Sequence, residues 1–232
     1  MSGCSVFVFE FITGGGLLAE AAAASGSLLS EGHAMRAALS GDLTALAGQV
    51  GHVSVLQDAR VVQRLPSAVR TVVVNEAAEF ERKFRALASE ADWTVVIAPE
   101  FDGHLLRCCG WVLDAGGRLL GPDLALVQLA SDKHRTAEFL AARGVASPRG
   151  VSLAAGAPWP EGFSTPAVLK PRDGAGSIDV CRLDAPLSCL PTSSECGAAG
   201  WRLEEHLPGT SASCAVLSGP SGSLVLPAML QR

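Results

Sequence analysis

Residues 5–16 read SVFVFEFITGGG, and this stretch decides the fold of the first part of the chain. Residues 5–12 are rich in Val, Phe and Ile, which predicts a β-strand. The triple glycine at 14–16 ends that strand, and residues 17–24 can begin a helix. The alternation continues in helices expected at 31–46 and 76–90 and in strands expected at 52–56, 69–74 and 93–98. Short apolar strands that alternate with helices predict an α/β fold with a doubly wound parallel sheet.

The pattern changes after residues 116–122, a glycine-rich stretch typical of a linker. The elements expected beyond it are a helix over 132–143 capped by Ser131 and ended by Gly144, strands at 167–170 and 201–207, and a hairpin of 212–217 with 223–226. Strands and turns are therefore more frequent there than in the first part. The sequence predicts two units, a doubly wound domain over residues 1–120 and an α+β domain over residues 121–232.

The composition excludes two classes of protein. Of 232 residues, 48% are hydrophobic and 18% are charged, and the mean hydropathy is +0.31, so the chain has the apolar content of a folded core rather than of a disordered segment. The net charge is -5, and no cluster of Lys and Arg appears. Because nucleic-acid binding requires such clusters to neutralise phosphates, no nucleic-acid partner is expected.

The N-terminal apolar run and the cysteines bear on location. Residues 6–18 contain Glu10 and three glycines and fall short of the roughly 20 apolar residues that a membrane-spanning helix needs. The first Lys or Arg is Arg36, so the run lacks the basic start of an export signal. The seven cysteines form no C-x-x-C pair, which favours incidental thiols over zinc sites or disulfides. We expect a cytoplasmic protein without a membrane partner.

The strongest local motif is LKPRDGAGS at residues 169–177. A strand carries Lys170 to a turn whose glycines let backbone amides point into one concavity, a geometry that binds phosphate. The spacing fits neither the P-loop nor the G-x-G-x-x-G fingerprint, which disfavours a Rossmann-type cofactor protein. Taken alone, the motif is better explained by an ordinary strand that ends in lysine before a solvated turn, which is a common arrangement.

The order of the motifs adds a resemblance. Lys133 begins a helix, Lys170 precedes the Gly/Ser turn, and Glu204 and Glu205 end a strand, in the order found in ATP-grasp enzymes. The opening FEFITGGG at 9–16 resembles the ATP-grasp branch that includes tyramine–L-glutamate ligase of methanofuran synthesis. The segments IAPE at 97–100 and SDK at 131–133 resemble the same branch. The resemblance implies a pre-ATP-grasp domain over residues 1–120, followed by the lid subdomain and the start of the last subdomain of an ATP-grasp domain.

The resemblance also implies roles for individual residues. The lysines would contact the phosphates of ATP, the Gly/Ser loop would close over them, and the hinge strand would read adenine through its backbone. These nucleotide-binding positions are Lys133, Lys170, Gly174, Ala175, Gly176, Ser177, Glu204, Glu205 and Leu207. A substrate would contact Thr13, Gly14, Gly15 and Gly16. A turn that needs positive φ explains the same glycines, and the neighbouring Glu10 needs a partner if it is buried.

The activity implied is ATP-dependent ligation of a small, amino-acid-like carboxylate to an amine through an acyl-phosphate, with Mg²⁺ on the phosphates. After Glu205 the sequence has no Asp, Glu or Asn. We therefore expect the magnesium ligands beyond residue 232 and none in this chain. The alternative is an ATP-binding module or pseudoenzyme that lacks the metal ligands. The sequence assigns no catalytic acid or base, and a homodimer is a candidate assembly.

Overall fold

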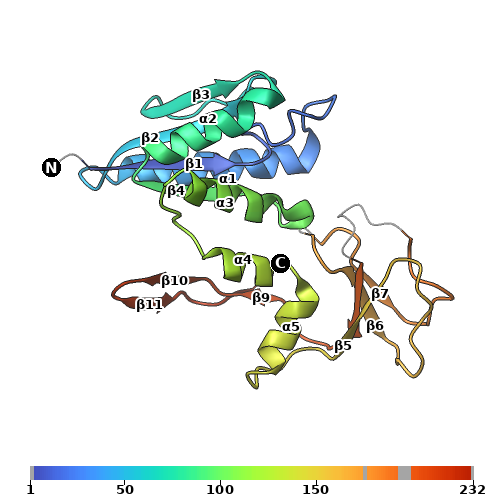
Figure 1. Ribbon diagram of the computed structural model, residues 1–232. Coiled ribbons are helices and arrows are strands. Elements are labelled where there is room, and N and C mark those ends of the chain that lie inside the picture. The colour runs from blue at the N-terminus through green and yellow to red at the C-terminus, as the bar shows by residue number, and fades with distance from the viewer. Residues whose placement is uncertain (1–2, 175–176, 193–199, 231–232) are drawn as a thin grey trace.

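The computed structural model describes residues 3–174, 177–192 and 200–230 (Figure 1). Its first part holds β1 (Cys4–Glu10), α1 (Gly26–Ala45), β2 (Val50–Asp58), β3 (Val69–Val74), α2 (Ala77–Glu90), β4 (Trp93–Ile97), the 3-10 turn η1 (Phe101–Gly103) and α3 (His104–Asp114). The second part holds α4 (Leu124–Ala130), α5 (Lys133–Ala141), β5 (Gly150–Leu153), β6 (Ala167–Pro171), β7 (Cys181–Leu183), β8 (Trp201–Glu205), β9 (Ala212–Ser213), β10 (Val216–Gly219), β11 (Gly222–Val225) and β12 (Met229–Leu230).

The first four strands form one parallel sheet in the order β3-β2-β1-β4. Alternate side chains of β1 enter the two cores on either face of this sheet. Phe7 and Phe9 pack with Phe84 of α2 and with α3, whereas Val6 and Val8 pack on the face that α1 covers. Because β1 is buried on both faces, it reads as a continuous apolar run. The predicted α/β fold with a doubly wound parallel sheet is confirmed.

The prediction of a helix at residues 17–24 is wrong. Residues 11–22 form turns and bends, residues 23–25 have no regular structure, and α1 begins only at Gly26. Arg60, which follows β2, donates to the carbonyl oxygens of Leu17 and Glu20, each at 2.8 Å. These are carbonyls that a helix would use for its own hydrogen bonds, so a side chain 40 or more residues away decides the local conformation.

The expected cap of the next helix is also wrong by one residue. Ser131 ends α4, and Asp132 caps α5 by accepting hydrogen bonds from the backbone of His134 at 2.9 Å and Arg135 at 3.1 Å. An aspartate carboxylate accepts two amides at once and carries a charge that the helix N-terminus favours, which explains why it takes the position.

A second, antiparallel sheet has the strand order β5-β8-β6-β7. One of its faces carries Leu169, Trp201 and Leu203 into a core that the loops around β5 and β7 cover. The opposite face carries polar side chains toward α5, as described below. The predicted strands at 167–170 and 201–207 are confirmed as β6 and β8, although β5, β7, α3 and α4 were not predicted.

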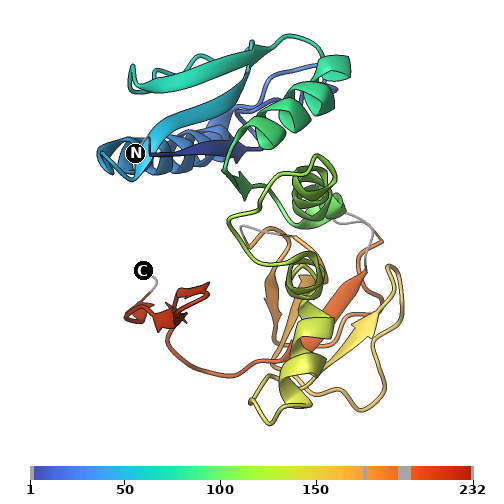
Figure 2. The ribbon, with the colours of Figure 1, turned by 60° about the vertical axis from the view of Figure 1, so that its left-hand side comes forward.

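The last strands form two small ribbons, β10 with β11 and β9 with β12. The first confirms a hairpin in this region, but its strands are shorter and shifted from the predicted 212–217 and 223–226, because residues 212–213 pair with 229–230 instead. It lies apart from both larger sheets (Figure 2). Its apolar side chains face solvent, among them Leu217 and Leu224, which are each 59% exposed. No helix among the described residues is long and apolar enough to cross a membrane.

This exposed segment predicts a pattern of proteolysis. Chymotrypsin is expected to cut first within residues 206–230, about ten-fold or more faster than within β1 to β4, because two-stranded ribbons are marginally stable and open readily. Mass spectrometry of the first fragments measures the order of cleavage. First cuts in β1 to β4, with residues 206–230 intact, would contradict the structure.

Candidate functional site

The start of α5 lies against the end of β6. The backbone N–H of Lys133 donates to the carbonyl oxygen of Arg172 at 2.8 Å, and the Arg172 guanidinium forms an ion pair with Asp132. The Lys133 ammonium donates to the carbonyl oxygen of Gly174 at 2.8 Å, across 41 residues of sequence. Hydrogen bonds from Arg172 and from the backbone keep the pKa of Asp132 below its usual value, although burial alone would raise it.

Lys170 approaches the same place from β6. Its ammonium forms an ion pair with Glu204 of β8, within the antiparallel register that sets Lys170 opposite Arg202. A cavity of about 270 Å³ lies between α5 and this polar face of the sheet. Its lining residues are Ala130, Lys133, Thr136, Ala137, Leu140, Ser147, Pro148, Lys170, Arg202 and Glu204. The structure therefore brings Lys133, Lys170 and Glu204 together in the cavity lining. The Gly174 carbonyl oxygen accepts a hydrogen bond from the Lys133 ammonium.

Of the other predicted nucleotide-binding residues that the structure describes, Glu205, Leu207 and Ser177 do not line this cavity. The Glu205 carboxylate accepts from the backbone N–H of Arg149 at 2.9 Å, because alternation along β8 turns it away from the face of Glu204. Leu207 lies beyond β8 and is exposed. Ser177 is exposed and has a φ of +59°. Ala175 and Gly176 lie outside the described residues.

Arg202 was missed by the sequence analysis, although it lines the cavity. Its side chain is only 2% exposed, and its Nε donates to Glu204 Oε2 at 2.7 Å. Its two other nitrogens reach His134 Nδ1 and the Pro148 carbonyl oxygen, both at 2.8 Å. The alternation of Trp201, Arg202, Leu203 and Glu204 was a usable signal, since it sets Arg202 and Glu204 on one face.

Glu10 organises the loop that contains the triple glycine. This buried carboxylate accepts from the backbone amides of Ile12 at 2.9 Å and Thr13 at 2.8 Å and from the Thr13 hydroxyl at 2.6 Å. Gly15 has a φ of +106°, and a Cβ on Gly14 would lie 2.4 Å from the Glu10 carbonyl oxygen. Turn geometry and packing thus account for glycine at 14 and 15, while substrate binding by Thr13, Gly14, Gly15 and Gly16 stays a prediction.

A buried cation lies under the same loop. Arg36 of α1 has no exposed surface, and its Nη1 donates to the carbonyl oxygens of Thr13 at 3.3 Å and Leu56 at 2.9 Å. Burial lowers the pKa of Arg36 to about 10, and the nearby Glu10 charge opposes that shift. Arg36 therefore stays protonated at neutral pH, and Glu10 has the charged neighbour that the sequence led us to expect.

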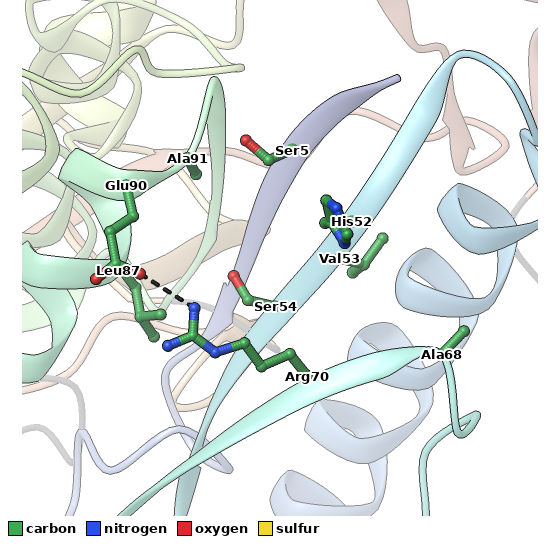
Figure 3. Close-up of a pocket in the computed structure, with 9 residues that line it drawn as sticks. All are labelled: Ser5, His52, Val53, Ser54, Ala68, Arg70, Leu87, Glu90 and Ala91. Carbon is green, nitrogen blue, oxygen red and sulfur yellow. Dashed lines mark hydrogen bonds and ion pairs between the residues drawn. The ribbon is translucent and has the colours of Figure 1, made fainter. Parts of the chain in front are cut away.

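A larger cavity of about 440 Å³ lies elsewhere, at the edge of the parallel sheet where its strands begin (Figure 3). Ser5, His52 and Ser54 line it, as do Arg70 and Glu90, which form an ion pair of 3.1 Å. None of the predicted site residues lines this cavity. Ligands of open α/β sheets bind at the opposite edge, outside the carboxyl ends of the strands. Three of the predicted nucleotide-binding residues, Lys133, Lys170 and Glu204, line the smaller cavity, which makes it the candidate nucleotide site.

The described residues do not supply a metal centre. Among them, no group of three or more His, Cys, Asp and Glu side chains could hold a metal ion. The donor set needed for Mg²⁺, in which oxygen atoms dominate, is thus incomplete in this part of the chain.

The cysteines that the structure describes are free thiols, and burial raises the pKa of Cys108 to about 12 and of Cys109 to about 11.

The chain has an ATP-grasp fold, in which the parallel sheet of the first part is followed by a second, antiparallel sheet. Residues 51–127 match the family model described as the pre ATP-grasp 3 domain. None of the curated protein sequences matches this chain.

Three solved structures illustrate the likeness. A protein from Archaeoglobus fulgidus assigned to the ATP-grasp superfamily is 18% identical, with a TM-score of 0.66 over 97% of this chain and 60% of its own. L-amino acid ligase from Bacillus licheniformis is 14% identical, with a TM-score of 0.58 over 99% and 51%. D-alanine–D-alanine ligase from Bacillus anthracis, complexed with ATP, is 14% identical, with a TM-score of 0.58 over 99% and 66%. The chain thus spans about half to two thirds of the length of these structures.

Proposed function

We propose that this chain carries the ATP-binding face of an ATP-dependent carboxylate–amine ligase. One observation carries the proposal: Lys133 from α5 and Lys170 from β6 line a single cavity, with the turn at Gly174 bonded to Lys133. Two ammonium groups in one partly enclosed site offset the charge of a triphosphate, and their fixed elements orient its terminal phosphoryl group. The ATP-grasp fold and the similarity to known ligases support this assignment.

The residues of the chain would divide the work as follows. Lys133 and Lys170 bind the phosphates, Gly174, Ala175, Gly176 and Ser177 close over them, and the backbone of Glu204, Glu205 and Leu207 faces adenine. ATP supplies the phosphoryl group that activates a carboxylate as an acyl-phosphate. Closure over the phosphates excludes water, which preserves that intermediate for the amine. No step is assigned to Mg²⁺, because the described residues do not form its ligand set.

The finer assignment is an amino-acid-like carboxylate bound near Thr13, Gly14, Gly15 and Gly16, as in the tyramine–L-glutamate ligase branch that the opening motif resembles. Two of the similar structures bear the names of an L-amino acid ligase and a D-alanine–D-alanine ligase, which supports such a substrate. The same proposal includes two domains that divide near residue 120, a cytoplasmic location and assembly as a homodimer.

A second candidate is a module that binds ATP without turnover, which the lack of a metal-ligand group among the described residues favours. Calorimetry with ATP, followed by ADP release with L-glutamate and tyramine, separates the two. With magnesium present, a ligase binds ATP and produces ADP over repeated turnovers only when both the carboxylate and the amine are present. A binding module binds ATP and releases none. Failure to bind ATP at all would overturn both assignments.

A further inference from the structure

Lys170 has a competing partner inside the candidate nucleotide site. Its ammonium forms an ion pair with Glu204 Oε1, and the Glu204 side chain is only 10% exposed. A lysine that turns toward a phosphate must loosen this pair. A carboxylate with so little contact with water is costly to leave without a cation. Something other than Lys170 must therefore compensate Glu204 while nucleotide is bound.

The sheet register supplies that second cation. Lys170 of β6 lies directly opposite Arg202 of β8, and Glu204 is the diagonal neighbour of Lys170 on the same face. Two positive charges opposite each other repel, so the carboxylate between them stabilises this register. Each Glu204 oxygen has its own cation, because Lys170 contacts Oε1 while the Nε of Arg202 contacts Oε2 at 2.7 Å.

Arg202 is held in place by partners other than Glu204, whereas the Lys170 side chain is more exposed and more flexible. The Nη1 of Arg202 lies 2.8 Å from His134 Nδ1, and its Nη2 donates to the Pro148 carbonyl oxygen at 2.8 Å. Because a guanidinium only donates, Nδ1 accepts and the ring hydrogen of His134 sits on Nε2, which lies 3.4 Å from Glu138 Oε1. The Lys170 side chain is 22% exposed and has a flexible stem.

We propose that Arg202 is a positioning residue that keeps Glu204 compensated, so that Lys170 can leave the carboxylate and contact the phosphates of the nucleotide. This inference rests on the proposed function. Arg202 itself keeps its position on the sheet and does not contact the phosphates. Removing its charge would leave Lys170 as the sole cation on Glu204 and hold the ammonium back from the nucleotide.

The first test needs no nucleotide. Lys83, Lys133 and Lys170 are the lysines of the sequence, so acetylation by acetic anhydride can be followed at each by mass spectrometry. Lys83 lies on α2 and serves as the internal reference. In Arg202→Met, the rate at Lys170 relative to Lys83 is expected to fall about three-fold, because Glu204 then depends on Lys170 alone. A sheet that had merely loosened would raise this ratio, and a rise or no change would overturn the proposal.

Glu204→Gln provides a second variant for this test in case the Arg202→Met variant folds poorly. It retains Arg202 and is expected to raise the relative rate at Lys170 about three-fold, because the restraining charge is gone. Circular dichroism checks the fold of each variant. No increase at Lys170 in folded Glu204→Gln would overturn the proposal independently.

The second test is a double-mutant cycle for binding of ATP with magnesium. Arg202→Met is expected to weaken binding about five-fold or more, and adding Glu204→Gln to it is expected to restore affinity to within about two-fold of the original protein. If the original protein binds ATP and the double variant stays as weak as Arg202→Met, the role of Arg202 fails and the proposed function stands. If neither the original protein nor any variant binds ATP, but acetylation at Lys170 changes as expected in Arg202→Met and Glu204→Gln, the proposed function fails. The sharing of Glu204 between Arg202 and Lys170 then still stands.

Discussion

Replacing Lys170 with methionine is expected to weaken ATP binding about 10- to 100-fold. The change keeps most of the length of the side chain and removes one charge-assisted contact to phosphate, which is worth roughly 1.5–3 kcal/mol. Isothermal titration calorimetry measures the affinity directly. Because Glu204 retains its hydrogen bond from Arg202, the variant is expected to fold normally.

The matched control is Lys83→Met. Lys83 also has an ion pair, with Glu79 at 2.9 Å, but it lies on α2 and lines neither described cavity. Its ATP affinity is expected to equal that of the original protein. An affinity of Lys170→Met within two-fold of this control would show that Lys170 does not contact the nucleotide.

Replacing Glu10 with glutamine is expected to lower the free energy of unfolding by about 3 kcal/mol. The carboxylate accepts three hydrogen bonds, from the amides of Ile12 and Thr13 and from the Thr13 hydroxyl. A glutamine presents an NH₂ group to one of these donors, and the buried Arg36 loses its neighbouring negative charge. Urea unfolding followed by circular dichroism measures the change.

Glu20→Gln is the control for Glu10, because Glu20 lies in the same loop and is exposed. Its effect is expected to stay within about 0.5 kcal/mol, as for surface substitutions in general. Equal stabilities of the two variants would mean that Glu10 does not hold the loop at residues 11–13.

The first sheet was predictable because its signals are local. Short segments rich in valine mark β1 to β4, and the amphipathic pattern of residues 76–90 marks α2. The conformation of residues 17–24 was not predictable, since it depends on hydrogen bonds from Arg60. The cap of α5 was missed because Ser131 and Asp132 both suit the position, and only the structure distinguishes them.

The sequence predicted which charged residues gather at the candidate site, but it did not predict how these residues pair with one another. The order of Lys133, Lys170 and Glu204 along the chain anticipated their shared cavity. The pairing of Glu204 with Arg202 depends on the register of β6 with β8, and the separation of Glu205 from this face follows from alternation along β8. Neither follows from motif order, which says nothing of strand pairing.

Protection of individual lysines by ATP tests the nucleotide site most directly. Acetylation of the original protein is followed with and without ATP and magnesium, with Lys83 as the internal reference. The proposed site predicts that ATP slows acetylation at both Lys133 and Lys170 by about ten-fold or more and leaves Lys83 unchanged. Equal rates at Lys133 and Lys170 with and without saturating ATP would contradict the central claim.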